Sequence, residues 1–305
     1  MSAKPEFTLT WRHWVITNLR RECAIESIVG AMVREGFDPP FAEAVVTVLK
    51  TEGTEDGTRL LADGANHDLR TPISTQSAIT GRVGGDYVYE SSRLPPGNVM
   101  VTEERTVRVL TRVKQPEVVV FGGLLSDDEC DELIRLSRPK LVRSTTVDPG
   151  TGQSIVIERR TSSGTYFHLE ENDFIARLDR RLAEVTCWPV DHSEGLQILH
   201  YQDGGEYRPH FDYFPPADAG SATHTSQGGQ RIGTVVMYLN DVDEGGETIF
   251  PEIGLSVAPR RGNAVYFGYC NSRNQVDPLT LHGGAPVRRG EKWIATKWLR
   301  KENRR

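Results

Sequence analysis

The chain has 305 residues, of which 37% are hydrophobic and 26% charged, and its formal net charge is −6. This length suits one large domain with a small one beside it, and the apolar content is sufficient for a real core. The acidic balance argues against a broad nucleic-acid-binding surface, and no stretch approaches the ~18 consecutive apolar residues of a membrane span.

Residues 1–55 are expected to form a small helical region. Apolar residues recur at helical spacing from 25 to 33, and Gly36 follows as a C-terminal stop. Pro39 opens a second helix, and a segment around Trp11 gives a third. A unit of this size is near the lower limit of independent stability, so these helices are candidates for self-association or for binding a partner.

Residues 56–104 are polar and rich in glycine and proline, which is typical of a linker, with one short strand expected near Tyr87–Tyr89. The four cysteines are far apart and form no C-x-x-C pair, which indicates free thiols in a reducing compartment. The first ten residues lack the apolar run of a signal peptide. These features together favour a cytoplasmic protein.

Residues 105–305 are expected to form the main domain. "TVRVLTRV" and "PEVVVF" resemble strands, and Ser126 with Glu129 forms a capping box that begins a helix before Pro139. Residues 172–186 predict a second amphipathic helix. From Gly195 onward short strands alternate with glycine turns, so the fold class is α+β, with an antiparallel sandwich or barrel.

A His-x-Asp pair lies in the stretch "GGEYRPHFDYF". On a strand, His210 and Asp212 would point to the same face. Two further pairs have similar spacing, His168 with Glu170 and His192 with Glu194, but they lie in turns, which place side chains less well.

A second histidine, His282, ends a strand-like stretch far downstream. Two histidines and one carboxylate on a rigid scaffold form the ligand set of non-heme Fe(II) oxygenases. A catalytic Zn(II) site could use the same ligands, so the three residues alone leave the metal open.

Lys292 follows His282 by ten residues, on the next expected strand. Alternation would put Lys292, Ile294, Thr296 and Trp298 on one face. An inward lysine is costly unless its ammonium is paired, and a dicarboxylate cosubstrate would supply that partner. The alternative is an edge-strand charge that faces water.

These residues resemble the prolyl 4-hydroxylase branch of the Fe(II)/2-oxoglutarate-dependent dioxygenases. The resemblance rests on four stretches: "RTSSGTYF", "EGLQILHYQDGGEYRPHFDYF", "GGQRIGTVVMYLNDVDEGGETIFPEIGLSVAPRRGNAVYF" and "LHGGAPVRRGEKWIATKWL". It covers about residue 105 to the end and implies a double-stranded β-helix (jelly-roll, cupin-like) core flanked by helices.

The resemblance also implies roles for individual residues. Fe(II) would be bound by His210, Asp212 and His282. The distal carboxylate of 2-oxoglutarate would meet Lys292, helped by Tyr201 and Thr248. The substrate would be approached by Tyr207, Arg231 and Trp298, with Arg160, Ser162 and Glu194 contributing from the loop side. Segments 144–164 and 215–230 are candidate lids, the second of them expected as a flexible loop.

The expected function is hydroxylation of a prolyl residue of a peptide or protein, with O₂ as oxidant and ascorbate as an optional reductant. A free amino acid or another small molecule is the alternative substrate. Two alternatives of a different class are a non-catalytic oxygen- or iron-sensing protein on the same scaffold and a zinc-dependent hydrolase. No general base is evident near His210 for hydrolysis.

Overall fold

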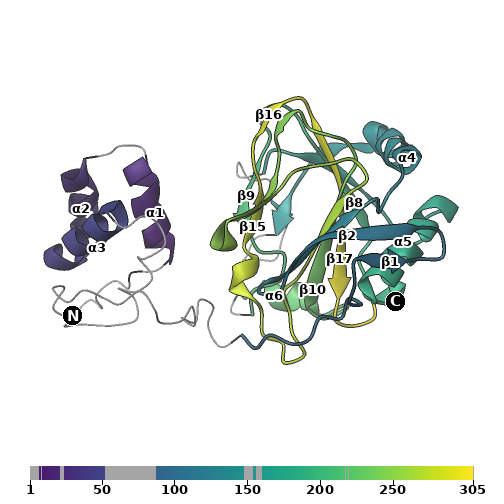
Figure 1. The fold of residues 1–305 in the computed structure, drawn as a ribbon, viewed down its shortest axis with the longest axis horizontal. Helices are drawn as coiled ribbons and strands as arrows, with labels where there is room; N and C mark the ends of the chain where they lie inside the picture. The colour runs from purple at the N-terminus through teal and green to yellow at the C-terminus, as the bar shows by residue number, and fades with distance from the viewer. Residues whose placement is uncertain are drawn as a thin grey trace. The chain divides into compact units, whose positions relative to one another are not determined.

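The computed structural model describes residues 7, 9–20, 24–51, 87–147, 154–155, 160–216, 218 and 220–304. The chain divides into two compact units, Met1–Ile79 and Thr80–Arg305. Figure 1 shows helices only in the described part of the first unit and a strand-rich second unit. The expected domain boundaries at 55 and 105 remain a prediction.

The first unit contains the three expected helices, α1 (Leu9–Arg20), α2 (Ile25–Arg34) and α3 (Pro39–Thr51). Gly36 ends α2 with a φ of 98°, a backbone conformation that side chains with a Cβ disfavour. Buried side chains from all three helices form one separate core, with Val15, Ile28 and Val46 among its members.

The second unit is built on two facing antiparallel sheets (Figure 1). The larger sheet has nine strands in the order β1-β2-β3-β14-β10-β17-β8-β7-β4, and the smaller has four in the order β13-β12-β15-β9. Two-stranded ribbons β11-β16 and β5-β6 complete it. The strands are β1 (Val99–Val101), β2 (Thr106–Val113), β3 (Glu117–Gly122), β4 (Val142–Arg143), β5 (Thr146–Val147), β6 (Ser154–Ile155), β7 (Ser163–Phe167), β8 (Leu196–Tyr201), β9 (Tyr207–His210), β10 (Arg231–Tyr238), β11 (Glu244–Gly245), β12 (Thr248–Phe250), β13 (Leu255–Val257), β14 (Ala264–Gly268), β15 (His282–Gly284), β16 (Val287–Arg289) and β17 (Lys292–Arg300).

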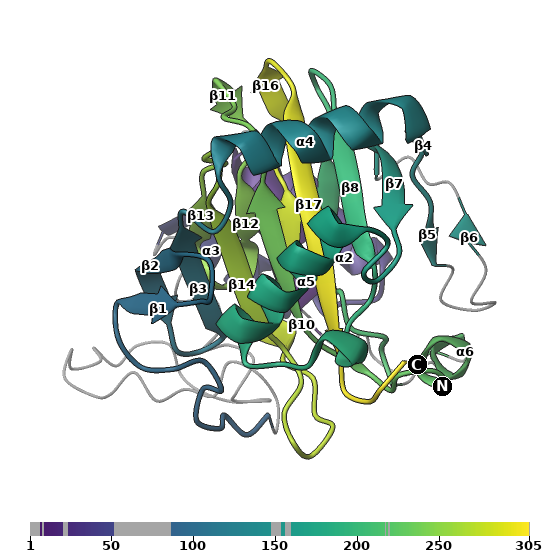
Figure 2. The ribbon, with the colours of Figure 1, turned by 90° about the vertical axis from the view of Figure 1, so that its right-hand side faces the viewer.

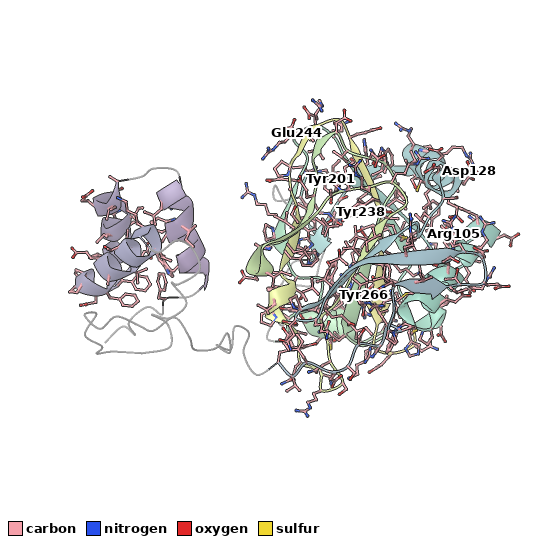
Figure 3. All side chains as sticks on the ribbon, viewed as in Figure 1. Arg105, Asp128, Tyr201, Tyr238, Glu244 and Tyr266 are labelled. Atoms are coloured by element: carbon pink, nitrogen blue, oxygen red, sulfur yellow. The ribbon has the colours of Figure 1, made fainter. Side chains whose placement is uncertain are left out.

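This arrangement is the double-stranded β-helix that the family resemblance implies, and it agrees with the antiparallel sandwich or barrel expected from the strand pattern. Large side chains lie between the sheets: Figure 3 shows Tyr201 and Tyr238 in the interior of the unit, whereas Asp128 lies on α4 at the surface. The remaining helical segments are α4 (Asp127–Ser137), α5 (Asp173–Thr186), α6 (Ser221–Thr225) and the short 3₁₀ turns η2 (Arg138–Lys140), η3 (Val190–His192), η4 (Pro251–Ile253) and η5 (Pro278–Thr280).

Helices α4 and α5 cover the outer face of the larger sheet (Figure 2). The predicted capping box begins α4: Ser126 Oγ accepts a hydrogen bond from the Glu129 amide, and the Glu129 carboxylate accepts one from the Ser126 amide. Helix α5 is tied to the sheet by a buried ion pair, in which Lys297 Nζ of β17 lies 2.7 Å from an Asp179 oxygen. The outer face of β17 therefore packs against α5, and only its inner face is turned toward the space between the two sheets.

Some expectations need correction. Residues 87–90 form no strand, and β1 lies instead at Val99–Val101, inside the segment expected as a linker. The expected flexible loop 215–230 contains the short helix α6. Residues 148–153 and 156–159 of the first candidate lid lie outside the described residues.

The cysteines at 130, 187 and 270 are free thiols, and Cys23 falls outside the described part. Within the ranges that the structure describes, no helix has the length and apolar character needed to cross a bilayer.

Candidate active site

Two strands of the smaller sheet bring His210 and His282 together. His210 is the last residue of β9 and His282 the first of β15, and the two are direct partners in the antiparallel register. Gly283 permits this close pairing, because a Cβ there would lie 2.9 Å from the main-chain oxygen of Tyr207. The imidazole ring centroids are 4.5 Å apart.

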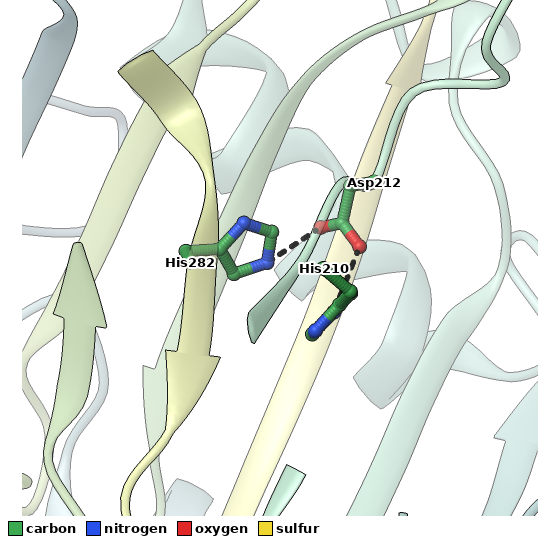
Figure 4. A group of neighbouring side chains, drawn as sticks. All are labelled: His210, Asp212 and His282. Carbon is green, nitrogen blue, oxygen red and sulfur yellow. Dashed lines mark ion pairs between the residues drawn. The ribbon is translucent and has the colours of Figure 1, made fainter. Parts of the chain in front are cut away.

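Asp212 completes the group, although it lies beyond the end of β9. Its Oδ1 is 3.6 Å from His210 Nε2, and its Oδ2 is 3.5 Å from His282 Nε2 (Figure 4). All three ligand-competent atoms lie within 4.8 Å of one another. Among the residues that the structure describes, this is the one group of three His, Cys, Asp or Glu side chains so arranged.

Both imidazoles are oriented with Nε2 toward the centre. Nδ1 of His210 is 2.9 Å from the carbonyl oxygen of Arg208, and Nδ1 of His282 is 3.0 Å from that of Thr280. Each Nδ1–H can therefore donate to a carbonyl, which leaves the Nε2 lone pair for a metal. Burial lowers the pKa of His282 to about 4, so this ring is neutral at physiological pH.

Asp212 is ionised. Burial alone would raise its pKa, but the two neighbouring imidazoles and the Arg231 guanidinium hold the pKa well below its usual range. The two imidazole Nε2 atoms and one carboxylate form a donor set that fits a divalent metal with open coordination positions.

The two other spaced pairs form no such centre. His192 Nδ1 contacts the carbonyl oxygen of Lys301, and Glu194 is paired with arginines. The main-chain amide of Glu170 binds Asp179. The turns that contain these residues place them away from a common point.

Lys292 lies on an interior strand of the larger sheet and is 3% exposed, so the alternative of an edge-strand charge facing water is wrong. Desolvation lowers the pKa of its ammonium to about 8. No hydrogen bond or ion pair of this ammonium is found with any residue in the described ranges, and the Tyr201 ring centroid is 5.5 Å away. A buried, unpaired cation of this kind fits an anionic ligand.

One cavity of about 800 Å³ contains these groups. The predicted inner face of β17 is confirmed, because Lys292, Ile294, Thr296 and Trp298 all line it. The other predicted residues that line it are His210, Asp212, His282, Tyr201, Thr248, Tyr207, Arg231 and Arg160. Ser162 and Glu194 do not line the cavity.

Tyr201 and Thr248 flank the inner end of the cavity from β8 and β12. Tyr201 is the register partner of Lys292, which places the phenol beside the ammonium. The Thr248 hydroxyl accepts a 2.8 Å hydrogen bond from Tyr238, a buried residue of β10 that the sequence analysis did not single out. These hydroxyls provide neutral polar groups near the cation.

Arg160 and Tyr207 form one side of the cavity. The Tyr207 ring stacks on His210 with centroids 3.6 Å apart, and the Arg160 guanidinium lies 4.9 Å from the Tyr207 centroid. Arg160 donates to the Thr145 carbonyl, the Gln197 side chain and Ser162 Oγ. Ser162 is fully buried, does not line the cavity, and contacts it through its bonds to Arg160 and Tyr201.

Arg231 and Trp298 form another side. The Arg231 guanidinium lies 4.0 Å from the Trp298 ring centroid and makes two bonds to Glu194, of 2.7 and 3.0 Å. It also donates to the main-chain oxygen of Asp212 at 3.3 Å. Much of its donor capacity is thus used within the protein, and Glu194 orients Arg231 rather than reaching the cavity.

Sequence reasoning missed Arg300. Its guanidinium binds Glu194 at 3.0 Å and donates to the carbonyl oxygens of His224 and Gln227, so it connects β17 with the segment around α6. The sequence signal for it is weak, because Arg300 is one of three basic residues of β17, with Lys292 and Lys297.

Comparison with known proteins agrees with this geometry. The model of the 2OG-Fe(II) oxygenase superfamily matches residues 196–300. Two proteins of Arabidopsis thaliana are similar to the chain. Probable prolyl 4-hydroxylase 3 is 43% identical over 61% of this chain and 69% of its own length, and prolyl 4-hydroxylase 5 is 39% identical over 70% and 77%.

Among solved structures, the viral collagen prolyl hydroxylase of Paramecium Bursaria Chlorella virus-1, in complex with 2-oxoglutarate, covers 60% of this chain and 95% of its own, with 28% identity and a TM-score of 0.47. The extent and identity of the Arabidopsis matches decide the assignment. The chain belongs to the prolyl 4-hydroxylase family of Fe(II)- and 2-oxoglutarate-dependent dioxygenases, and it is an oxidoreductase of that class.

Proposed function

We propose that this enzyme hydroxylates prolyl residues of a peptide or protein, with Fe(II) held by His210, Asp212 and His282. The two imidazole Nε2 atoms and the Asp212 carboxylate supply three ligands and leave further positions open. Fe(II), when bound with 2-oxoglutarate and O₂, supplies oxidative decarboxylation to succinate and CO₂ together with insertion of one oxygen atom into a C–H bond.

Lys292 is proposed to bind the distal carboxylate of 2-oxoglutarate. Its ammonium is buried in the same cavity as the proposed metal ligands, and no described residue pairs with it. A carboxylate at this point would compensate the buried charge, and the Tyr201 and Thr248 hydroxyls can donate to it. The cosubstrate would then extend from this end of the cavity toward the metal ligands.

The aromatic rings of Tyr207 and Trp298 are proposed to flank the target proline. A proline ring presents only C–H surface, which packs well against aromatic faces. Arg160 and Arg231, each already fixed by hydrogen bonds, supply N–H groups beside these rings. Because these guanidinium groups are already ordered, they can donate a hydrogen bond to a peptide carbonyl at a low entropic cost.

The observation that carries the proposal is the shared cavity. The donor set of two histidines and one aspartate, the buried ammonium of Lys292 and the two aromatic rings all line one space of about 800 Å³. A non-catalytic binding protein has no need of a complete ligand set with an unpaired buried ammonium beside it, so catalysis is favoured.

The test is succinate release in the presence of Fe(II), 2-oxoglutarate and O₂. Proline-rich peptides should stimulate release and gain one oxygen atom by mass spectrometry, whereas the same peptides with alanine at each proline should not. Stimulation by free proline, but not by peptides, would favour the small-molecule alternative. Release that no substrate stimulates, including cell lysate, would contradict the proposal.

Three finer expectations stay predictions: a cytoplasmic location, ascorbate as a reductant, and self-association or partner binding through α1–α3. The catalytic proposal does not depend on any of them, and no residue of α1–α3 lines the cavity.

A further inference from the structure

The position of Asp212 raises the question of what holds its carboxylate in place. β9 ends at His210, so strand pairing does not fix residue 212. A carboxylate that binds a metal must be held in a narrow range of orientations. The bonds that orient it must therefore come from another element, and both that the structure shows come from β10.

The first bond is to the main chain of Asp212, from Arg231 at the beginning of β10. The second is to its side chain: Thr234 Oγ1 lies 2.7 Å from Asp212 Oδ2. Thr234 is fully buried within β10 and does not line the cavity. Its hydroxyl therefore serves the carboxylate and is not available to a substrate.

A third residue sets the direction of these bonds. Thr234 Oγ1 is also 3.0 Å from the hydroxyl of Tyr269, which is 1% exposed and follows β14. An ionised carboxylate can only accept, so Thr234 must donate to Asp212. Tyr269 must then donate to Thr234, and burial, which raises the pKa of Tyr269 well above its usual value, keeps that proton in place.

We infer that Thr234 is the positioning residue of the metal centre, acting on Asp212 through a hydrogen-bond chain that Tyr269 begins. This inference rests on the proposed function. The hydroxyl of Thr234 occupies one acceptor site of Oδ2 and limits rotation of the carboxylate. With that site filled, the carboxylate keeps Oδ1 toward His210 Nε2 and Oδ2 toward His282 Nε2, where a metal held by both imidazoles would meet it.

The first experiment measures metal affinity rather than catalysis. The full-length protein is stripped with a chelator and titrated anaerobically with Mn(II), and free Mn(II) is followed by electron paramagnetic resonance. Thr234→Val keeps the shape and removes the hydroxyl, and it should weaken Mn(II) binding by about 10–100-fold. Thr234→Ser keeps a hydroxyl and should restore most of the affinity.

Thr186→Val is the matched control. Thr186 is a buried threonine of α5 whose hydroxyl donates to the Leu182 carbonyl, outside the site. This variant should bind Mn(II) as the unmodified protein does. Equal Mn(II) affinity in Thr234→Val and Thr186→Val, or failure of Thr234→Ser to exceed Thr234→Val, would overturn the inference.

The second experiment tests the chain itself. Tyr269→Phe should weaken Mn(II) binding by about fivefold, as expected for loss of one neutral hydrogen bond, and should have no further effect when Thr234 is already valine. Full additivity of the two changes would contradict the chain. If Thr234→Val does not fold, unchanged affinity in Tyr269→Phe alone would contradict it.

Asp212→Ala separates this inference from the function on which it rests. If that variant binds Mn(II) normally, the metal site itself is wrong. If Asp212→Ala loses binding while Thr234→Val retains it, the metal site stands and the role of Thr234 is wrong.

Discussion

His210 and His282 are direct register partners across β9 and β15, with imidazole centroids 4.5 Å apart. The pairing of two short strands therefore brings together two rings that lie far apart in the sequence. A metal that binds both rings connects β9 to β15, so binding should stabilise the smaller sheet against unfolding.

The first prediction concerns the ligand set. Anaerobic addition of Fe(II) and 2-oxoglutarate should produce a weak visible charge-transfer band, and Asp212→Ala should abolish it, because one of three protein ligands is lost. His168→Ala, in a similar His-x-acid pattern outside the cavity, should retain the band. A band of normal intensity in Asp212→Ala would remove that residue from the site.

The second prediction concerns Lys292. Lys292→Ala should raise the 2-oxoglutarate KM by roughly a hundredfold, because loss of one partner of a buried charge pair costs about 3 kcal/mol. The control is a double variant of the neighbouring buried pair, Lys297→Met with Asp179→Asn, which lies on the other face of β17. That variant should keep the normal KM, and an equal rise in both proteins would exclude a specific role for Lys292.

The third prediction is a pH dependence of cosubstrate binding. Desolvation lowers the pKa of Lys292 to about 8 in the absence of ligand. Above this pH the lysine is neutral, so the dissociation constant of 2-oxoglutarate should rise by up to about tenfold per pH unit. Calorimetric titration between pH 7 and about 9.5 in the presence of Mn(II) measures it. Lys292→Arg stays charged throughout, and an identical slope in that variant would assign the titration to another group.

The fourth prediction concerns Glu194, which pairs with Arg231, Arg300 and Arg304. Glu194→Gln should reduce the free energy of unfolding by about 3 kcal/mol, because the two more buried arginines lose their counter-charge. It should also raise the peptide KM while leaving the 2-oxoglutarate KM unchanged, since Arg231 supports Trp298 and not Lys292.

A control for Glu194 is Glu132→Gln, which breaks an exposed pair with Arg135 and should cost less than about 1 kcal/mol. Burial would raise the pKa of Glu194, but its arginine partners lower it to about 2. Its stabilisation is therefore present above about pH 4.5 and is lost as the pH falls toward 2. Thermal unfolding at pH 3 and pH 6 should show a larger difference for the unmodified protein than for Glu194→Gln.

The fifth prediction concerns stability at α4. Ser126→Ala removes the side-chain half of the capping box and should cost about 1 kcal/mol in the free energy of unfolding. Ser137→Ala at the other end of the helix is the control. Its hydroxyl is buried without a hydrogen-bond partner among the described residues, so its removal should be neutral or stabilising. Urea titration of both variants gives the comparison.

The sequence predicted the helices well, because apolar spacing and capping residues act within a few positions of one another. The spacing of apolar residues predicted α1 to α3, and the capping box predicted the beginning of α4. The expected strand near Tyr87 is wrong: Tyr87 and Tyr89 make an edge-to-face ring contact, and residues 87–90 join no strand ladder. Strand pairing depends on distant partners, and β1 forms because β2 lies beside it.

The site shows the same limit. Strand alternation gave the correct face for Lys292 and Trp298, because β17 is regular over nine residues. Alternation also predicted that His210 and Asp212 lie close together. Strand geometry does not fully explain this, because β9 ends at His210 and hydrogen bonds from β10 orient Asp212. Glu194 was expected to reach the substrate, and only the folded arrangement reveals the arginines that surround it.

One strand, β17, carries two deeply buried ammonium groups of the same chemistry. Lys292 faces the cavity and Lys297 faces α5, and the difference is only that five positions, an odd number, separate them. Because alternate residues of a strand face opposite sides, this odd spacing directs Lys292 toward the ligand cavity and Lys297 toward the carboxylate of Asp179. A single residue inserted between them would give both amines the same orientation, so insertions and deletions here should be far more damaging to this enzyme than most substitutions.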